Sequence, residues 1–264
     1  MLRNVFTKTL WDQRRGIIGW SIGIAAVGVI YAAFYPSMAN PDMAAAMEAF
    51  PEGMLDALGF TDITTPAGYL GGTTYGLLGP VLMIIFASTM GAGAIAGEEE
   101  AGRLDVLLAH PISRRSVLAQ RAASLLVAVV VAGAVLFVAI VAAAGPAEYD
   151  EIGVGNLAAA TAQLVALGAF FGVLAMAAGA VTGRRSLALA TVAVIGIVGY
   201  IANTLGPSIE ALSWSRDVSP FHFYSGGQPL VNGWQPVDGL VLLVAAAVLV
   251  GVGVVGFQRR DVAV

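Results

Sequence analysis

Six long apolar runs constrain the fold of this sequence more than any other feature. They cover residues 16–35, 75–96, 122–144, 157–181, 187–205 and 239–257. Each is close to the roughly 20 residues with which a helix crosses about 30 Å of hydrocarbon. Because lipid offers no hydrogen-bond partners to the backbone, each crossing segment must be helical. We therefore expect an all-α membrane protein, with six transmembrane helices in a single domain over residues 1–264.

The composition agrees with this class and argues against chemistry within the chain. Charged residues make up 11% of the sequence, whereas soluble domains carry about 25%. There is no cysteine, and the two histidines, His110 and His222, fall on opposite sides of the predicted membrane. Neither a metal site nor a catalytic constellation is therefore expected. The sequence favours a protein that is not itself an enzyme and binds no cofactor.

Lys8 is the only lysine in the sequence, and it lies between Thr7 and Thr9. A phosphate-binding loop needs a lysine after a glycine-rich turn. The chain therefore lacks a P-loop, and any ATP chemistry must come from a partner.

The basic residues predict the orientation in the membrane. Twelve of the thirteen fall on the side of both termini and of the loops 97–121 and 182–186, and the opposite side holds only Arg216. Positive charge accumulates on the cytoplasmic side of membrane proteins. We expect a multi-pass protein of the plasma (inner) membrane with both termini cytoplasmic.

Two regions outside the spans have amphipathic patterns. Residues 1–15 are basic and predict an interfacial elbow helix, with Trp11 at headgroup depth. The alternatives are a simple positive flank of the first span or, less favoured, a cleaved signal peptide. In the outer loop, residues 36–74, apolar residues recur at helical spacing on both sides of Pro51. This pattern predicts two short helices on the outer membrane surface.

The loop 97–121 concentrates charge between two apolar runs. We expect Glu98, Glu99 and Glu100 at the start of a short helix, where negative charge complements the helix dipole. Leu104, Leu107 and Leu108 would form one apolar stripe along that helix. Pro111 would end it, and Ser113 would cap the next helix. The alternative is a loop that merely lies on the lipid surface.

No Asp, Glu, Lys, Arg or His lies well inside a predicted span, which argues against a proton-driven carrier. Gln163 and Asn203 are the weak candidates for a substrate path, and interhelical hydrogen bonds are the favoured alternative for both. Gly168 and Gly172 form a GxxxG pair that allows close approach of helices.

The sequence resembles the permease subunits of ABC type-2 exporters, in particular six-helix permeases without a fused ATPase. The resemblance rests on the following residues of the charged loop: Gly97-Glu98, Glu100, Gly102, Leu104, Leu107, Leu108, Pro111, Ser113 and Arg114. Arg103 departs from the pattern, since a small hydroxyl residue is more usual there. Further matches are Ser219-Pro220-Phe221 with Tyr224, and the ending with Phe257, Arg259, Arg260 and Asp261.

This resemblance implies a dimer with a second permease, identical or homologous, and two copies of a cytosolic ABC ATP-binding subunit that hold ATP and magnesium. It implies efflux of a drug, antibiotic or lipid-like amphipathic substrate, and no nucleic-acid partner. The loop between spans two and three would be the cytoplasmic coupling helix that docks on the ATPase, through Glu98, Glu99, Glu100, Gly102, Leu104, Leu107, Leu108, Pro111 and Arg114. An ATP-independent carrier and a membrane scaffold or assembly subunit remain alternatives.

Overall fold

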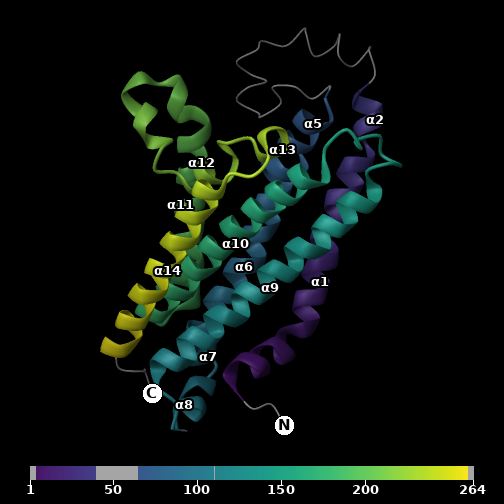
Figure 1. Cartoon of the computed structure of the whole chain (residues 1–264). Coiled ribbons are helices and arrows are strands. Elements are labelled where there is room, and N and C mark those ends of the chain that lie inside the picture. The colour runs from purple at the N-terminus through teal and green to yellow at the C-terminus, as the bar shows by residue number, and fades with distance from the viewer. Residues whose placement is uncertain (1–3, 40–64, 110, 261–264) are drawn as a thin grey trace.

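The computed structural model describes residues 4–39, 65–109 and 111–260. In these ranges the structure is helical without β-strands, and six helical runs are long and apolar enough to cross a membrane. They lie side by side in one bundle (Figure 1). The predicted all-α architecture with six spans is therefore confirmed.

The elements follow one another along the chain as longer spans joined by short helices. Span 1 is α1 (Val5–Ala33), followed by the short α2 (Tyr35–Met38). Span 2 is a continuous run of α5 (Pro66–Gly72), a π-helical turn η1 (Thr74–Leu78), α6 (Gly79–Ala92), a second π-helical turn η2 (Gly93–Gly97) and α7 (Glu98–Glu100). The remaining elements are α8 (Arg103–Leu108), span 3 or α9 (Arg114–Ala143), span 4 or α10 (Val154–Thr182), span 5 or α11 (Arg185–Leu205), the 3-10 turns η3 (Gly206–Ser208) and η4 (Glu210–Ser215), α12 (Pro220–Ser225), α13 (Pro229–Asn232) and span 6 or α14 (Pro236–Arg259).

The spans extend beyond the predicted apolar runs because polar residues cap them further out. The Ser113 hydroxyl accepts a hydrogen bond from the Ser116 N–H at 3.2 Å, so span 3 begins at residue 114 instead of 122. Span 2 begins at Pro66, where the Thr65 hydroxyl accepts from the Gly68 N–H. These caps also confirm Ser113 as the start of span 3.

The N-terminal region differs from the prediction of a separate interfacial helix. α1 is continuous from Val5, with Asn4 as its cap and its Oδ1 accepting from the Thr7 N–H at 2.8 Å. The first turns run at an angle to the rest of the helix (Figure 1). Trp11 is exposed there, with the Arg14 guanidinium 4.1 Å from its ring centroid. The basic segment is thus the bent beginning of span 1.

Span 4 forms the centre of the bundle, and most of its residues are buried. It packs against spans 2, 3 and 6. Gly172 makes the closest approach, because a Cβ on Gly91 of span 2 would lie only 2.0 Å from the Gly172 carbonyl oxygen. A Cβ on Gly168 would likewise meet the Met83 side chain at 2.6 Å. The predicted GxxxG pair therefore does bring helices together.

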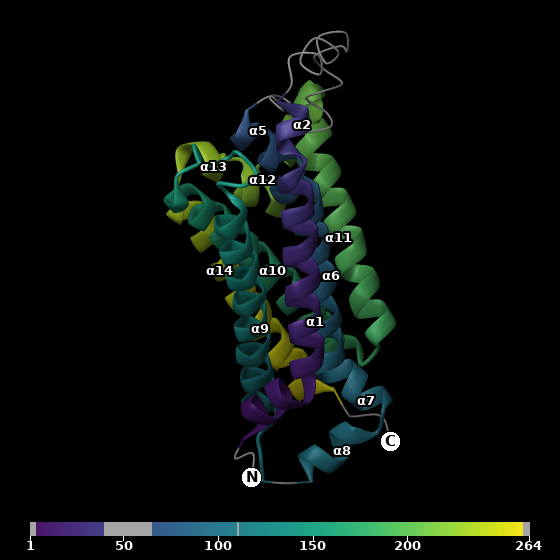
Figure 2. The same cartoon turned by 90° about the vertical axis from the view of Figure 1, so that its right-hand side faces the viewer.

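The beginning of α1 and the end of α14 lie at the same end of the bundle as α8 (Figures 1 and 2). An even number of spans requires this arrangement. The side of the membrane on which that end lies stays a prediction. The two amphipathic helices expected around Pro51 lie outside the described residues.

Candidate functional site

Span 2 ends in three consecutive acidic residues, Glu98, Glu99 and Glu100, which we call the three-glutamate cluster. They form α7, the last turn of the span, and the chain leaves the helix at Gly102, whose φ is +65°. The expectation that they begin a helix is therefore wrong. Carboxylates at the C-terminal end of a helix face the negative end of its dipole. Three negative charges at this position therefore destabilise the helix end, unless cations or N–H groups from other elements interact with the carboxylates.

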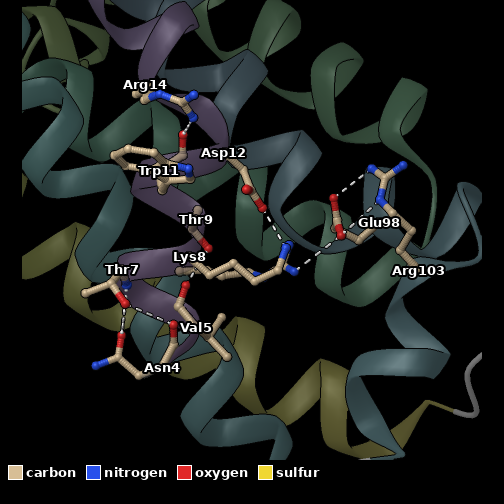
Figure 3. Close-up of polar contacts among 11 residues, drawn as sticks. Asn4, Val5, Thr7, Lys8, Thr9, Trp11, Asp12, Arg14, Glu98 and Arg103 are labelled. Carbon is tan, nitrogen blue, oxygen red and sulfur yellow. Dashed lines mark hydrogen bonds and ion pairs between the residues drawn. The ribbon is translucent and has the colours of Figure 1, made fainter. Parts of the chain in front are cut away.

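Glu98 lies between two arginines from different elements, Arg103 and Arg121. Figure 3 shows its contact with Arg103. Its Oε1 accepts from Arg103 Nη2 at 2.8 Å, and its Oε2 accepts from Arg103 Nε at 3.3 Å. The hydrogen bond with Glu98 raises the pKa of Arg103 above its usual value. Arg121 of span 3 is buried and places Nη2 3.5 Å from the Glu98 Oε2. Glu98 thus joins α8 to span 3.

The other two carboxylates reach spans 5 and 6. Glu99 forms an ion pair with Arg260, the residue directly after α14. Glu100 Oε1 accepts from the backbone N–H of Arg185, the first residue of α11, at 2.8 Å. Three adjacent side chains therefore connect the end of span 2 with α8 and with spans 3, 5 and 6. This connection was not foreseen from the sequence.

Arg114 belongs to the same end of the bundle and has a structural role there. Its Nη1 donates to the carbonyl oxygens of Phe257 at 2.7 Å and Arg260 at 2.6 Å. The guanidinium carbon also lies 5.2 Å from the centroid of the Phe257 ring. Arg114 therefore caps the C-terminal end of α14, where cations are favourable. Its part in docking on a partner stays a prediction.

Two leucines of the predicted α8 stripe, Leu104 and Leu107, face the bundle. Leu104 is fully buried in the core, and Leu107 is half-buried against it. The Leu108 side chain lies outside the description. We expected the stripe to fit a cleft on a partner, and for Leu104 the burial contradicts this, because a side chain already inside the core cannot dock. The side that α8 presents outward carries Arg103 and Asp105, and Pro111 is exposed just beyond its end.

The two candidate path residues do not form a common site. The Gln163 side-chain nitrogen donates to the Gln235 carbonyl oxygen at 2.8 Å, just before span 6 begins. This is an interhelical packing contact, the alternative favoured by the sequence. Asn203 lies near the end of α11, and no hydrogen bond to its buried Oδ1 is present within the described residues.

A groove lies between span 2 and α11, with a cavity volume of about 640 Å³. One wall includes Leu77, Pro80 and Ile84, and the other includes Ala193 and Ile197. Its lining contains neither Gln163 nor Asn203, and its side-chain hydroxyls are those of Ser88, Thr89 and Tyr200. The Ser88 hydroxyl is buried and has no partner within the described residues. The groove can accept a largely apolar molecule with one or two hydrogen-bonding groups.

Little in the sequence indicates this groove. Residues 187–205 read as an ordinary span, because lipid-facing and groove-facing side chains are equally apolar. The groove is recognised only from the packing of α11. This helix is the least buried of the six candidate spans in the described residues. Large side chains such as Val194 and Val198 are exposed along it.

Comparison with known proteins agrees with this architecture. No curated protein matches the chain at a significant level. One family model matches residues 2–258, nearly the whole chain, and it describes the C-terminal domain of the multidrug efflux system permease Rv1217c. Six apolar spans together with that match make the chain a multi-pass membrane protein. It belongs to the family of the multidrug efflux system permease Rv1217c, C-terminal domain.

Proposed function

We propose that this chain is the membrane-spanning subunit of an ATP-driven ABC exporter of the type-2 family. Within it, the chain would move uncharged or amphipathic molecules, such as drugs, antibiotics or lipid-like compounds, out through the plasma membrane. The observation that carries this proposal is the three-glutamate cluster. It joins four spans at one end of the bundle, directly beside the short exposed helix α8.

The lack of a P-loop assigns ATP and magnesium to another protein. Two copies of an ATP-binding subunit would dock at α8, on the cytoplasmic side, and this chain would not hydrolyse ATP itself. Arg103 and Asp105 are the charged groups that α8 exposes to such a partner. A displacement of α8 would reach span 2 through the Arg103–Glu98 pair and span 3 through Glu98 and Arg121.

The groove between span 2 and α11 would hold the substrate. Its volume of about 640 Å³ falls within the range of small-molecule sites, roughly 300–1,000 Å³. No charged side chain lines it, which favours uncharged or amphipathic molecules. The exposed apolar face of α11 would be covered by a second permease, identical or homologous, and the groove would then lie inside the complex.

Co-purification tests the docking step. Asp105→Arg reverses an exposed charge on α8 and should reduce recovery of an ATP-binding subunit from native membranes. Asp217→Arg makes the same change at the opposite end of the bundle, where Asp217 is also exposed, and should leave recovery unchanged. If no ATP-binding subunit co-purifies with the unmodified chain, the ATP-driven proposal is wrong. An ATP-independent carrier or a scaffold then becomes the better explanation.

Drug efflux from cells tests the groove. Ala193→Trp fills the groove from α11, whereas Val248→Trp places the same ring on the exposed face of α14, outside the groove lining and away from the α11 face proposed to meet the second permease. We expect loss of efflux with the first variant and retained efflux with the second. Equal efflux from both variants would remove the groove from the substrate path. Normal ATPase association without efflux from the unmodified chain would indicate an assembly role.

A further inference from the structure

Span 2 is interrupted by two π-helical turns, η1 near its outer end and η2 near the charged end. At η1 the Leu78 N–H donates to the Thr73 carbonyl oxygen at 3.1 Å, and the Gly79 N–H donates to the Thr74 carbonyl oxygen. Both bonds join residues five apart, whereas an α-helix joins residues four apart. Single π-turns of this kind are rare and often mark functional positions and kinks.

The outer turn leaves one carbonyl without a helical partner. The oxygen of Tyr75 could accept from the N–H of residue 79 or residue 80. The Gly79 N–H is already bonded to Thr74, and Pro80 has no N–H. The hydroxyl of Tyr224, from α12, donates to this oxygen instead. Tyr224 is buried, so its hydroxyl is held in place at this oxygen by the surrounding side chains.

The inner turn also receives a hydrogen bond from a distant side chain. Arg121 Nη1 donates to the carbonyl oxygen of Ala94, inside η2. Arg121 comes from span 3 and is buried, with a relative exposure of 8%. A backbone carbonyl in each π-turn of span 2 therefore accepts a hydrogen bond from a distant side chain, and η1 is also joined to span 4 by the hydrogen bond between the Tyr75 and Thr161 hydroxyls at 2.9 Å. In a membrane helix, donors from neighbouring elements can satisfy backbone carbonyls that the regular helical hydrogen bonds leave free.

Span 2 packs closely against span 4 in its middle, and a cavity lies beside its outer turn. A Cβ on Gly91 of α6 would lie 2.0 Å from the Gly172 carbonyl oxygen, so the central segment is held against span 4. Beside η1, by contrast, lies a cavity of about 500 Å³, lined in part by Gly68, Tyr75 and Tyr224. The outer segment α5 therefore has space next to the point where the helix ladder is broken.

We propose that span 2 bends at its two π-turns, and that Tyr224 and Arg121 are positioning residues that hold the two bends in the arrangement seen here. The central segment α6 stays against span 4, while α5 and α7 change direction relative to it. Because Leu77 and Pro80 line the groove between span 2 and α11, bending at η1 reshapes one groove wall. The link to the groove rests on the proposed function, whereas the bending itself is a property of this chain without its partners.

Hydrogen–deuterium exchange of the purified chain in lipid nanodiscs tests the outer bend. Tyr224→Phe keeps the buried ring and removes only the hydroxyl. We expect backbone amides of residues 77–79 to exchange roughly fivefold faster, the effect of losing one hydrogen bond. Arg121→Met should accelerate exchange around η2 and leave residues 77–79 unchanged. Unchanged exchange at η1 in Tyr224→Phe would overturn the proposal.

Spin labels measure the bend itself, because the sequence has no cysteine to remove. The pair Ala67→Cys and Val138→Cys reports on α5 against span 3. The pair Ile85→Cys and Val138→Cys reports on the central segment and serves as the control. Tyr224→Phe should broaden or shift the distance distribution of the first pair only. Equal changes in both pairs would mean general loosening and would contradict a local bend.

Pro80→Ala separates the hydrogen bond from simple packing of the Tyr224 ring. It restores an N–H that can donate to the Tyr75 carbonyl oxygen from within the helix. In the Pro80→Ala background, Tyr224→Phe should therefore change exchange at residues 77–79 by less than about twofold, since the lost donor is replaced. The same acceleration in both backgrounds would show that Tyr224 acts through packing and would overturn its assigned role. None of these measurements needs an ATPase or a substrate, so a failure of the proposed export function leaves their outcome unaffected.

Discussion

Glu98→Gln is the most informative single change at the charged end, because it keeps the side-chain shape and removes one shared charge. Glu98 faces two cations of different exposure. The Arg103 side chain is 64% exposed, so water can replace its partner. The Arg121 side chain is only 9% exposed. The cost of the substitution should therefore arise almost entirely from Arg121.

The magnitude follows from that environment. Removing one partner of a fully buried ion pair costs about 3–5 kcal/mol. Here the Glu98 side chain is 26% exposed, and its oxygen lies 3.5 Å from the Arg121 nitrogen. Arg121 also keeps its bond to the Ala94 carbonyl oxygen. Removing a negative charge from a helix C-terminus stabilises the fold by about 0.3–1 kcal/mol, because the charge no longer faces the negative end of the helix dipole. We expect Glu98→Gln to lower the free energy of unfolding by about 1–2 kcal/mol.

Equilibrium unfolding in mixed micelles, followed by tryptophan fluorescence, measures this value. Arg103→Gln is the control and should have a much smaller effect than Glu98→Gln. Arg121→Met combined with Glu98→Gln should cost less than the sum of the two single changes, because the double variant leaves no buried charge unpaired. Strictly additive costs, or an Arg103→Gln effect as large as that of Glu98→Gln, would refute the reasoning.

Three further substitutions test other parts of the fold. Gly172→Leu should lower the free energy of unfolding by at least about 2–3 kcal/mol, since the new Cβ alone would lie 3.0 Å from Ala87 Cβ. A normal yield and an unchanged unfolding curve would contradict the close packing. Ser219→Ala should cost about 1 kcal/mol, because its hydroxyl caps α12 and donates to the Gly199 carbonyl oxygen at 2.7 Å; unfolding curves check this. Gln163→Leu should change stability by no more than about 1 kcal/mol and leave drug efflux intact, and a selective loss of efflux would make Gln163 a substrate contact.

The six spans were predictable because bilayer thickness sets their length and lipid enforces helical backbone. Their ends were less predictable, since caps such as Thr65 and Ser113 lie outside the apolar runs. The bent start of α1 shows the same limit. Polar residues from Asn4 onward continue the helix, although composition alone separates them from the span.

The charged end illustrates why the rest could not be predicted. Glu98, Glu99 and Glu100 look like the first turn of a helix, because that is where carboxylates are favourable on their own. Their true position depends on Arg121, Arg185 and Arg260, which are distant in the sequence. The inward direction of Leu104 and the groove beside α11 likewise depend on how the helices pack.

Glu98 links the surface of α8 to the inner π-turn of span 2. Its carboxylate is shared by Arg103, which is exposed on α8, and by Arg121, which holds the inner π-turn through Ala94. In the proposed complex, a partner that draws Arg103 away would leave Glu98 to interact with Arg121 alone, and a change at the surface of α8 would then reach the inner π-turn. Apolar side chains could stabilise the same contact equally well. A shared carboxylate, in contrast, makes the arrangement of span 2 sensitive to what is bound outside it.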